Sequence, residues 1–101
     1  MILRDYIGTA LLNERKTQGR TLRNVADRAQ VALGYVSEVE RGRKEVSSEV
    51  LRSICEALYM TVGDLMVDVT VAMKKDEEQK VALERASVEL SAVNHKDPIT
   101  L

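Results

Sequence analysis

Residues 21–42 read TLRNVADRAQVALGYVSEVERG, and apolar positions recur in this stretch at intervals of three and four. Because residues three and four apart share one face of an α-helix, the stretch predicts two short helices, at about 22–30 and 33–41. Thr21 can cap the first helix with its side-chain oxygen, and Gly42 can end the second. Two helices of this length, joined by a turn of three or four residues, cannot form a core alone, so they require flanking helices.

The sequence on either side predicts three more helices: one over about 3–18, one that follows Ser47 and Ser48 and runs to about residue 59, and one that starts near Val62. The first of these has an inward apolar stripe of Leu3, Ile7, Ala10 and Leu11. Gly19 provides a stop for that helix. Thr61 and Asp64 have the spacing of a capping box at the start of the last. The expected fold class is therefore all-α, with five helices in a domain over residues 1–69.

The remaining segment, residues 70–101, differs in character. The charge run KKDEE at 74–78 leads into a predicted final helix over about 77–93. Apolar residues recur in that helix with the 3-4-3 spacing of a coiled-coil seam: Leu83, Ala86, Leu90 and Val93. We therefore predict a C-terminal dimerisation helix, with a frayed tail from Asn94 onward. The alternative is that this helix folds back and packs on its own domain.

Charge is distributed unevenly along the chain. The net charge of −1 and the pI near 5.8 disfavour a nucleic-acid partner when the 101 residues are taken as a whole. Residues 1–60, however, hold ten Lys or Arg against eight Asp or Glu, a net +2, and residues 61–101 hold five against eight, a net −3. Arg41, Arg43 and Lys44 fall within four positions, a modest basic patch that can serve DNA when two copies act together.

Residue content gives no support to several other classes of function. Cys55 is the one cysteine, so neither an intramolecular disulfide nor a cysteine metal cluster can form, and a reducing cytoplasm is expected. No apolar run approaches the ~20 residues of a membrane span, and a signal peptide is not expected. His95 has no partner for a metal or for a catalytic triad. Without a glycine-rich phosphate loop or a paired nucleophile and base, we expect no enzyme, no cofactor and no metal.

The stretch from Gly19 to Leu65 resembles the five-helix XRE family of phage-type repressors and their bacterial relatives. The resemblance implies a phage-repressor-like helix-turn-helix domain. A narrower similarity to the actinobacterial Clp gene regulators is carried by LGYVSEVERG at 33–42, KEVSSE at 44–49 and the pair Leu22-Arg23. That similarity implies an activator of Clp protease genes.

In this fold the N-terminal end of the second helix of the pair contacts base edges, while the first helix crosses the DNA backbone. Leu33 can contact a thymine methyl, Gly34 allows close approach, and Ser37 or Glu38 can accept from cytosine. Arg23 is the candidate for a bidentate contact with guanine. The Tyr35 hydroxyl and the cations after the helix suit phosphates. The expected DNA-binding residues are Thr21, Arg23, Leu33, Gly34, Tyr35, Ser37, Glu38, Arg41, Arg43 and Lys44.

Two departures from the family pattern affect these contacts. Leu22 replaces a Gln that commonly holds a phosphate or a base, and Ala32 replaces a capping Ser, a loss of about 1 kcal/mol. The resemblance also implies that Arg15 and Glu40 form a structural pair inside the domain instead of touching DNA. Glu38 has the alternative of being merely solvated, and the basic cluster has that of an ordinary solvated turn.

The predicted function is a sequence-specific transcription regulator that binds double-stranded DNA at a palindromic, inverted-repeat operator. A homodimer is expected, because the contacts of two half-sites then add. Activation would also require a surface for RNA polymerase, which the sequence does not locate. The alternative is an antitoxin-type protein that binds a toxin through its C-terminal helix. The sequence determines neither the operator nor the signal that controls the protein.

Overall fold

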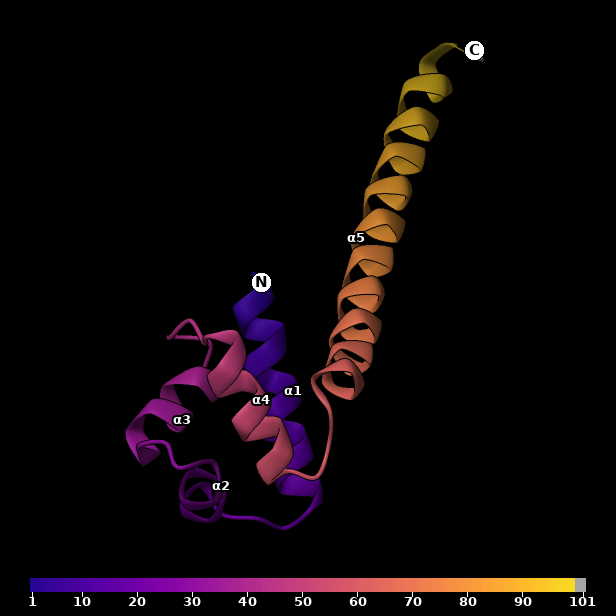
Figure 1. Cartoon of the computed structure of the whole chain (residues 1–101). Helices are drawn as coiled ribbons and strands as arrows, with labels where there is room; N and C mark the ends of the chain where they lie inside the picture. The colour runs from indigo at the N-terminus through magenta and orange to yellow at the C-terminus, as the bar shows by residue number, and fades with distance from the viewer. Residues whose placement is uncertain (100–101) are drawn as a thin grey trace. The chain divides into compact units, whose positions relative to one another are not determined.

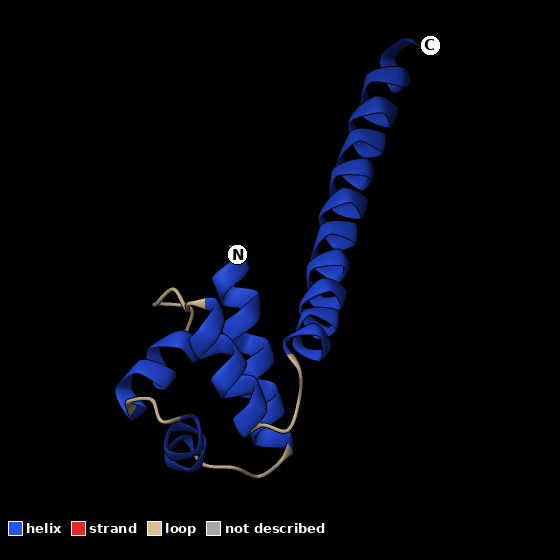
Figure 2. Ribbon diagram, in the orientation of Figure 1, coloured by secondary structure: helices blue, strands red, loops and turns tan. Residues whose placement is uncertain are grey.

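Helices are the only regular secondary structure in the part of the chain that is described, as the sequence predicts (Figure 2). The computed structural model describes the backbone of residues 1–99 and the side chains of residues 1–91. The helices follow one another as α1 (Leu3–Thr17), α2 (Leu22–Ala29), α3 (Leu33–Glu40), α4 (Ser48–Ala57) and α5 (Val62–Ile99) (Figure 1). Contacts divide the chain into two compact units, Met1–Val71 and Ala72–Leu101. Among the described residues, none of the helices combines the length and hydropathy needed to cross a lipid bilayer.

The core of the first unit is aliphatic and draws on all five helices. Helix α2 packs against α3 and α4, and α1 packs against α3. The largest fully buried side chains are Leu11, Val25, Val36, Val39, Ile54, Cys55, Leu58, Leu65 and Val69. Burying an aliphatic side chain of this size contributes about 1.5–3 kcal/mol, whereas a helix of eight residues is unstable in isolation. Packing therefore holds α2 and α3 in place.

Side-chain caps fix where two of the helices begin. At the start of α2, Thr21 Oγ1 accepts a hydrogen bond of 3.0 Å from the main-chain nitrogen of Asn24. At the start of α4, Ser47 Oγ accepts one of 3.2 Å from the nitrogen of Val50. Helix α3 begins after Ala32, which supplies no side-chain cap, as the sequence predicts. The fixed position of α3 therefore depends on contacts made elsewhere along it.

Helix α5 is longer than the sequence predicts. We expected a separate final helix after the charge run 74–78 and a frayed tail from Asn94 onward. The backbone instead forms one helix of 38 residues from Val62 to Ile99. The physical reason is that residues 64–97 contain neither Gly nor Pro, and Lys, Glu and Gln are good helix formers. A charge run of this composition is a solvated helical segment and does not interrupt a helix.

Two smaller expectations are also corrected. The buried face of α1 consists of Gly8 and Leu11, whereas Leu3, which we placed in the inward stripe, is 49% exposed. Helix α4 ends at Ala57, ahead of the predicted end at Tyr59. The chain turns there because Tyr59 adopts a left-handed conformation with φ of 56°.

Candidate nucleic-acid interface

The first turn of α3 is exposed, where the predicted reading end lies. Leu33 is 37% exposed, and a Cβ added to Gly34 would meet no atom within 4 Å. Ser37 and Glu38, one turn further along, are partly exposed. Val36 lies on the opposite side, is buried in the core and fixes the helix. Helix α3 is therefore anchored along one face and accessible along the other.

Helix α2 contributes an accessible cation at its beginning. Arg23 is exposed, and it forms no hydrogen bond or ion pair with the described residues. Thr21 is exposed as well, although its oxygen is used in the helix cap. Beside them, Arg20 Nη1 donates a 2.9 Å hydrogen bond to Asn24 Oδ1. The guanidinium of Arg23 is thus the unengaged donor group at this end of α2.

The turn after α3 carries the basic cluster. Arg41, Arg43 and Lys44 are exposed, and within the described part of the chain none of their side chains has a hydrogen-bond or ion-pair partner. The turn itself is tied to α3, since the main-chain nitrogen of Arg43 donates a 2.9 Å hydrogen bond to the carbonyl oxygen of Glu38. Three neighbouring unpaired cations repel one another, and a polyanion such as a DNA backbone would relieve that repulsion.

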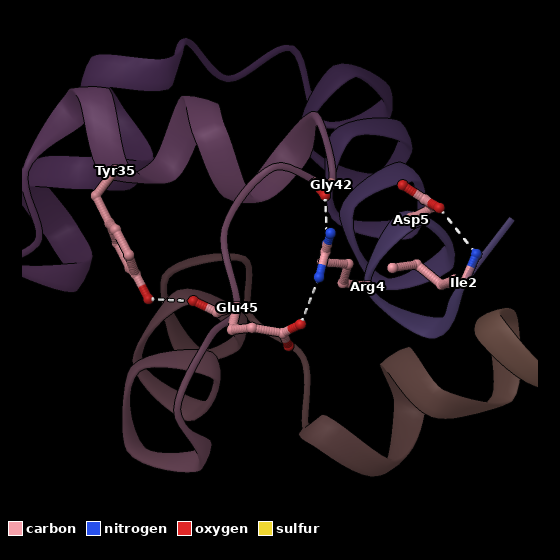
Figure 3. A network of polar contacts seen from close by, with 6 residues as sticks. All are labelled: Ile2, Arg4, Asp5, Tyr35, Gly42 and Glu45. Atoms are coloured by element: carbon pink, nitrogen blue, oxygen red, sulfur yellow. Dashed lines mark hydrogen bonds and ion pairs between the residues drawn. The ribbon is translucent and has the colours of Figure 1, made fainter.

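The Tyr35 hydroxyl, which we expect to suit a phosphate, has a hydrogen-bond partner within the protein. It donates a 2.8 Å hydrogen bond to the main-chain carbonyl oxygen of Glu45 (Figure 3). The sequence could not indicate this contact, because it depends on the conformation of the turn between α3 and α4. Tyr35 thus connects the first turn of the reading helix to the basic turn that follows it.

Arg15 and Glu40, the two residues that the family resemblance pairs, are joined in the structure. Arg15 Nε lies 2.8 Å from Glu40 Oε2, and Arg15 Nη2 lies 3.1 Å from Oε1. The side chains are 12% and 6% exposed. Hydrogen bonding to Glu40 raises the pKa of Arg15, against the opposing effect of burial. The remaining guanidinium nitrogen donates a 2.9 Å hydrogen bond to the carbonyl oxygen of Arg20. This pair connects α1 to the C-terminal end of α3 and is largely shielded from solvent.

The predicted dimerisation residues are exposed where they are described. Leu83 and Leu90 are 72% and 66% exposed, and Ala86 is exposed too. Val93 lies outside the residues whose side chains are described. Helix α5 exposes four further valines that the sequence analysis missed: Val67, Val71, Val81 and Val88. Three of those four are separated by multiples of seven, a spacing that could have identified them.

Sequence reasoning also missed two polar clusters. The Tyr59 ring lies beneath two guanidinium carbons, that of Arg20 at 4.9 Å and that of Arg28 at 4.6 Å from its centroid. No spacing in the sequence relates these three residues. The second cluster is centred on Arg4. Arg4 lies four residues before the buried Gly8 and therefore on the same face of α1, and this spacing could have identified it.

The described part of the chain contains neither a metal-binding group of side chains nor a reactive thiol. None of the described His, Cys, Asp and Glu residues gather in a group that could hold a metal ion. Cys55 is fully buried, and burial, reinforced by Asp64 and Glu56, raises the pKa of its thiol to about 11. The thiol is therefore protonated at neutral pH and acts as a small apolar core residue.

Comparison with known families and curated proteins identifies this arrangement. The model of a helix-turn-helix domain matches residues 7–66, which is more than half of the chain. The transcriptional regulator ClgR of Mycobacterium tuberculosis (strain H37Rv) is 47% identical over 76 residues, which cover 75% of this chain and 68% of that protein.

Solved structures agree with the sequence comparison. The crystal structure of the clp gene regulator ClgR from Corynebacterium glutamicum matches with a TM-score of 0.77 and 42% identity, over 83% of this chain and 89% of that one. The restriction-modification controller protein C.Esp1396I, solved as a tetramer on its natural 35 base-pair operator, matches with a TM-score of 0.62 over 69% of this chain and 97% of that one. At 18% identity, the second match shows a common fold alone.

Proposed function

This chain belongs to the helix-turn-helix transcription regulators, and from this premise we propose that it binds an inverted-repeat operator as a homodimer and controls clp genes. The observation that carries the proposal is the exposed first turn of α3, flanked by cations without partners among the described residues. A short helix with one accessible end fits the major groove, where each base pair presents a distinct pattern of donors and acceptors.

We assign base contacts to the exposed end of α3 and to Arg23. Leu33 would contact a thymine methyl, while Gly34 leaves room for the approach of the DNA. Ser37 or Glu38 would accept a hydrogen bond from a cytosine amino group, and Arg23 would donate two hydrogen bonds from its guanidinium to guanine. Thr21, exposed beside Arg23, would contact the adjoining backbone.

Phosphate contacts are assigned to the basic turn formed by Arg41, Arg43 and Lys44. Such contacts set the register and the overall affinity without reading sequence, and they make binding strongly dependent on salt. The modest net charge of the first 60 residues supports a dimer here, because two copies double the number of phosphates that are neutralised.

The homodimer is proposed to form through α5. In one copy the apolar side chains of Leu83 and Leu90 are largely exposed to water, at an unfavourable free energy that pairing with a second copy would remove. A two-fold dimer requires a two-fold operator, so inverted half-sites about one helical turn apart are expected.

The target genes are proposed from the similarity to two proteins that are named ClgR, one of which is described as a clp gene regulator. Activation of such genes would bring the bound dimer into contact with RNA polymerase at the promoter. As a regulator of bacterial genes, the protein would act in the cytoplasm, where the chromosome lies.

The test is selection of bound fragments from the source genome, followed by measurement of the mass of the complex on the selected site. The proposal expects an inverted repeat upstream of clp genes, bound by two chains. A selected site without two-fold symmetry, or a site bound by one chain, would contradict the homodimer. Absence of any selected DNA, together with co-purification of a second protein, would favour the antitoxin alternative.

A further inference from the structure

We propose that Arg4 is a positioning residue that holds the turn between α3 and α4 in the conformation that presents Arg43 and Lys44 to DNA phosphates. The inference rests on the proposed function, because it explains how the proposed phosphate contacts are prepared. Arg4 lies in the first turn of α1, far from the turn along the sequence, and was not among the residues expected to affect DNA binding.

Arg4 contacts both sides of the basic turn through two hydrogen bonds (Figure 3). Its Nε donates to the carbonyl oxygen of Gly42 at 2.8 Å, and its Nη1 donates to Glu45 Oε1, also at 2.8 Å. The two acceptors lie on either side of Arg43 and Lys44. A single planar guanidinium therefore bonds the main chain just before Arg43 and the side chain just after Lys44.

The main chain of Glu45 is held independently from α3. Its carbonyl oxygen accepts the 2.8 Å hydrogen bond from the Tyr35 hydroxyl, while its carboxylate accepts from Arg4 (Figure 3). Glu45 is thus connected to the first turn of α1 and to the first turn of the reading helix. The turn cannot move relative to α3 without breaking one of these bonds.

Close packing supports the same arrangement at Gly42. This glycine is buried and has φ of 73°, a conformation that favours glycine. A Cβ at this position would collide with the Asp5 carboxylate and would lie 3.2 Å from Asp5 Cα. The Asp5 carboxylate is itself held, since the main-chain nitrogen of Ile2 donates to its Oδ2 at 2.9 Å (Figure 3). The start of α1 and the start of the turn are therefore in direct contact.

Between these attachments, Arg43 and Lys44 have no side-chain partner among the described residues. Fixing their backbone before DNA arrives lowers the conformational entropy that binding would otherwise lose. Arg4 would then increase DNA affinity through Gly42 and Glu45, without touching DNA itself.

The sign of one substitution separates positioning from simple electrostatics. Glu45 carries a negative charge beside the proposed phosphate ligands, so Coulomb repulsion alone predicts that Glu45→Ala tightens DNA binding. Positioning predicts the opposite, because Ala cannot accept the hydrogen bond from Arg4. Glu45→Gln removes the charge and keeps an acceptor oxygen, so it should restore most of the affinity that Ala loses.

The experiment measures the dissociation constant of the full chain on its selected operator, with thermal unfolding recorded for each variant. We expect Glu45→Ala and Arg4→Lys each to weaken binding about threefold, the scale of an exposed ion pair, and the double variant to be no weaker than either. Glu56→Gln and Arg52→Lys, at exposed positions whose side chains form no hydrogen bond or ion pair with the described residues, serve as matched controls and should leave the constant unchanged.

The outcomes distinguish this inference from the proposed function. Tighter binding by both Glu45 variants, wild-type affinity for Arg4→Lys, or additive losses in the double variant would overturn the positioning role. If the wild-type chain selects no DNA, the proposed function fails instead. Amide hydrogen exchange at Arg43, whose nitrogen donates to the Glu38 carbonyl oxygen, then tests the attachment alone, and it should accelerate in Glu45→Ala if Arg4 holds the turn.

Discussion

At the scale of single residues, Glu40 is the last residue of the reading helix α3, and its buried carboxylate accepts two hydrogen bonds from Arg15. Glu40→Ala leaves the guanidinium of Arg15 unpaired in a site with little water, and we expect a loss of about 3 kcal/mol in the free energy of unfolding. Urea unfolding followed by circular dichroism measures the loss. Glu45→Ala is the matched control, because it breaks an exposed ion pair and should cost less than about 1 kcal/mol. Equal losses for the two variants would contradict the structural role of Glu40.

Arg23 and Lys44 are both exposed cations, yet their proposed contacts predict different losses. Arg23→Ala should weaken binding to the selected operator by about 1–3 kcal/mol and change unrelated DNA little, because a base contact is lost. Lys44→Ala should weaken binding to all sequences, because a phosphate contact is lost. The slope of the logarithm of the binding constant against the logarithm of the salt concentration should then fall in magnitude by about one. Titrations on operator and scrambled DNA at several salt concentrations measure both. A uniform loss for Arg23 would remove it as a base reader, and a sequence-selective loss for Lys44 would remove its phosphate contact.

The sequence could indicate residue roles only where a local or family pattern carries them. The pairing of Arg15 with Glu40 follows from the family resemblance, and the cap at Thr21 follows from local spacing. The partner of the Tyr35 hydroxyl within the protein was not predicted, because it depends on how a turn ten residues further along is folded. Arg4 was missed for the same reason, because its partner Glu45 is 41 residues away.

At the scale of the helical element, the start of α5 contains a capping box that depends on the charge of Asp64. Asp64 Oδ2 accepts from the main-chain nitrogen of Thr61 at 3.0 Å, and the nitrogen of Asp64 donates to Thr61 Oγ1 at 3.0 Å. The bonds to the main chain and side chain of Thr61 lower the pKa of Asp64 below its ordinary value of 3.8. The ionised carboxylate is therefore the form that the folded helix favours.

That lowered pKa fixes the sign of a pH effect. The stabilisation by Asp64 is fully present above its ordinary pKa and is lost as pH falls through the lower folded value. Asp64→Ala should therefore lower the melting temperature near neutral pH, and the difference from the wild type should shrink as the pH falls below the ordinary pKa of 3.8. Thermal unfolding across this range measures the difference, with Asp68→Ala as the control at an exposed position without a described partner. A difference that stays constant at low pH would show that the carboxylate charge is not what caps α5.

Helix starts were more predictable than helix continuity. The starts of α2 and α5 follow from Thr21 and from the pair Thr61 and Asp64, because a cap is a contact between residues three apart. The continuity of α5 through residues 74–78 was not predicted, because a run of charges suits both a linker and a solvated helix. Helix propensity, summed over the window, favours the helix and was the better guide.

At the scale of the whole molecule, the proposed dimer predicts what truncation does. Removing the residues after Asp76 deletes Leu83 and Leu90 while leaving the compact unit Met1–Val71 complete. We expect a folded, monomeric protein that binds the operator weakly, because one chain then contacts one half-site. Analytical ultracentrifugation gives the mass, and circular dichroism verifies that the shorter chain is folded.

A full-length control separates loss of the seam from loss of length. The double variant Leu83→Lys and Leu90→Lys should be monomeric as well, since it places like charges where two helices would meet. A truncated chain that remains dimeric would contradict the predicted seam. It would point instead to Val67 and Val71, which are exposed within the first unit.

The division of α3 into two ends has a consequence for how regulators of this kind can diverge. The attachments of this helix lie at its C-terminal end and just beyond it, at Val39, Glu40 and Gly42. Gly8 lies so close to the main chain of Val39 and Glu40 that no side chain could be added at Gly8. Leu33 and Gly34, at the N-terminal end of α3, take no part in those attachments. Side chains at the exposed end can therefore change while the contacts that anchor the helix stay the same. A library varied at these positions should yield stable proteins with new targets, a route to orthogonal gene switches.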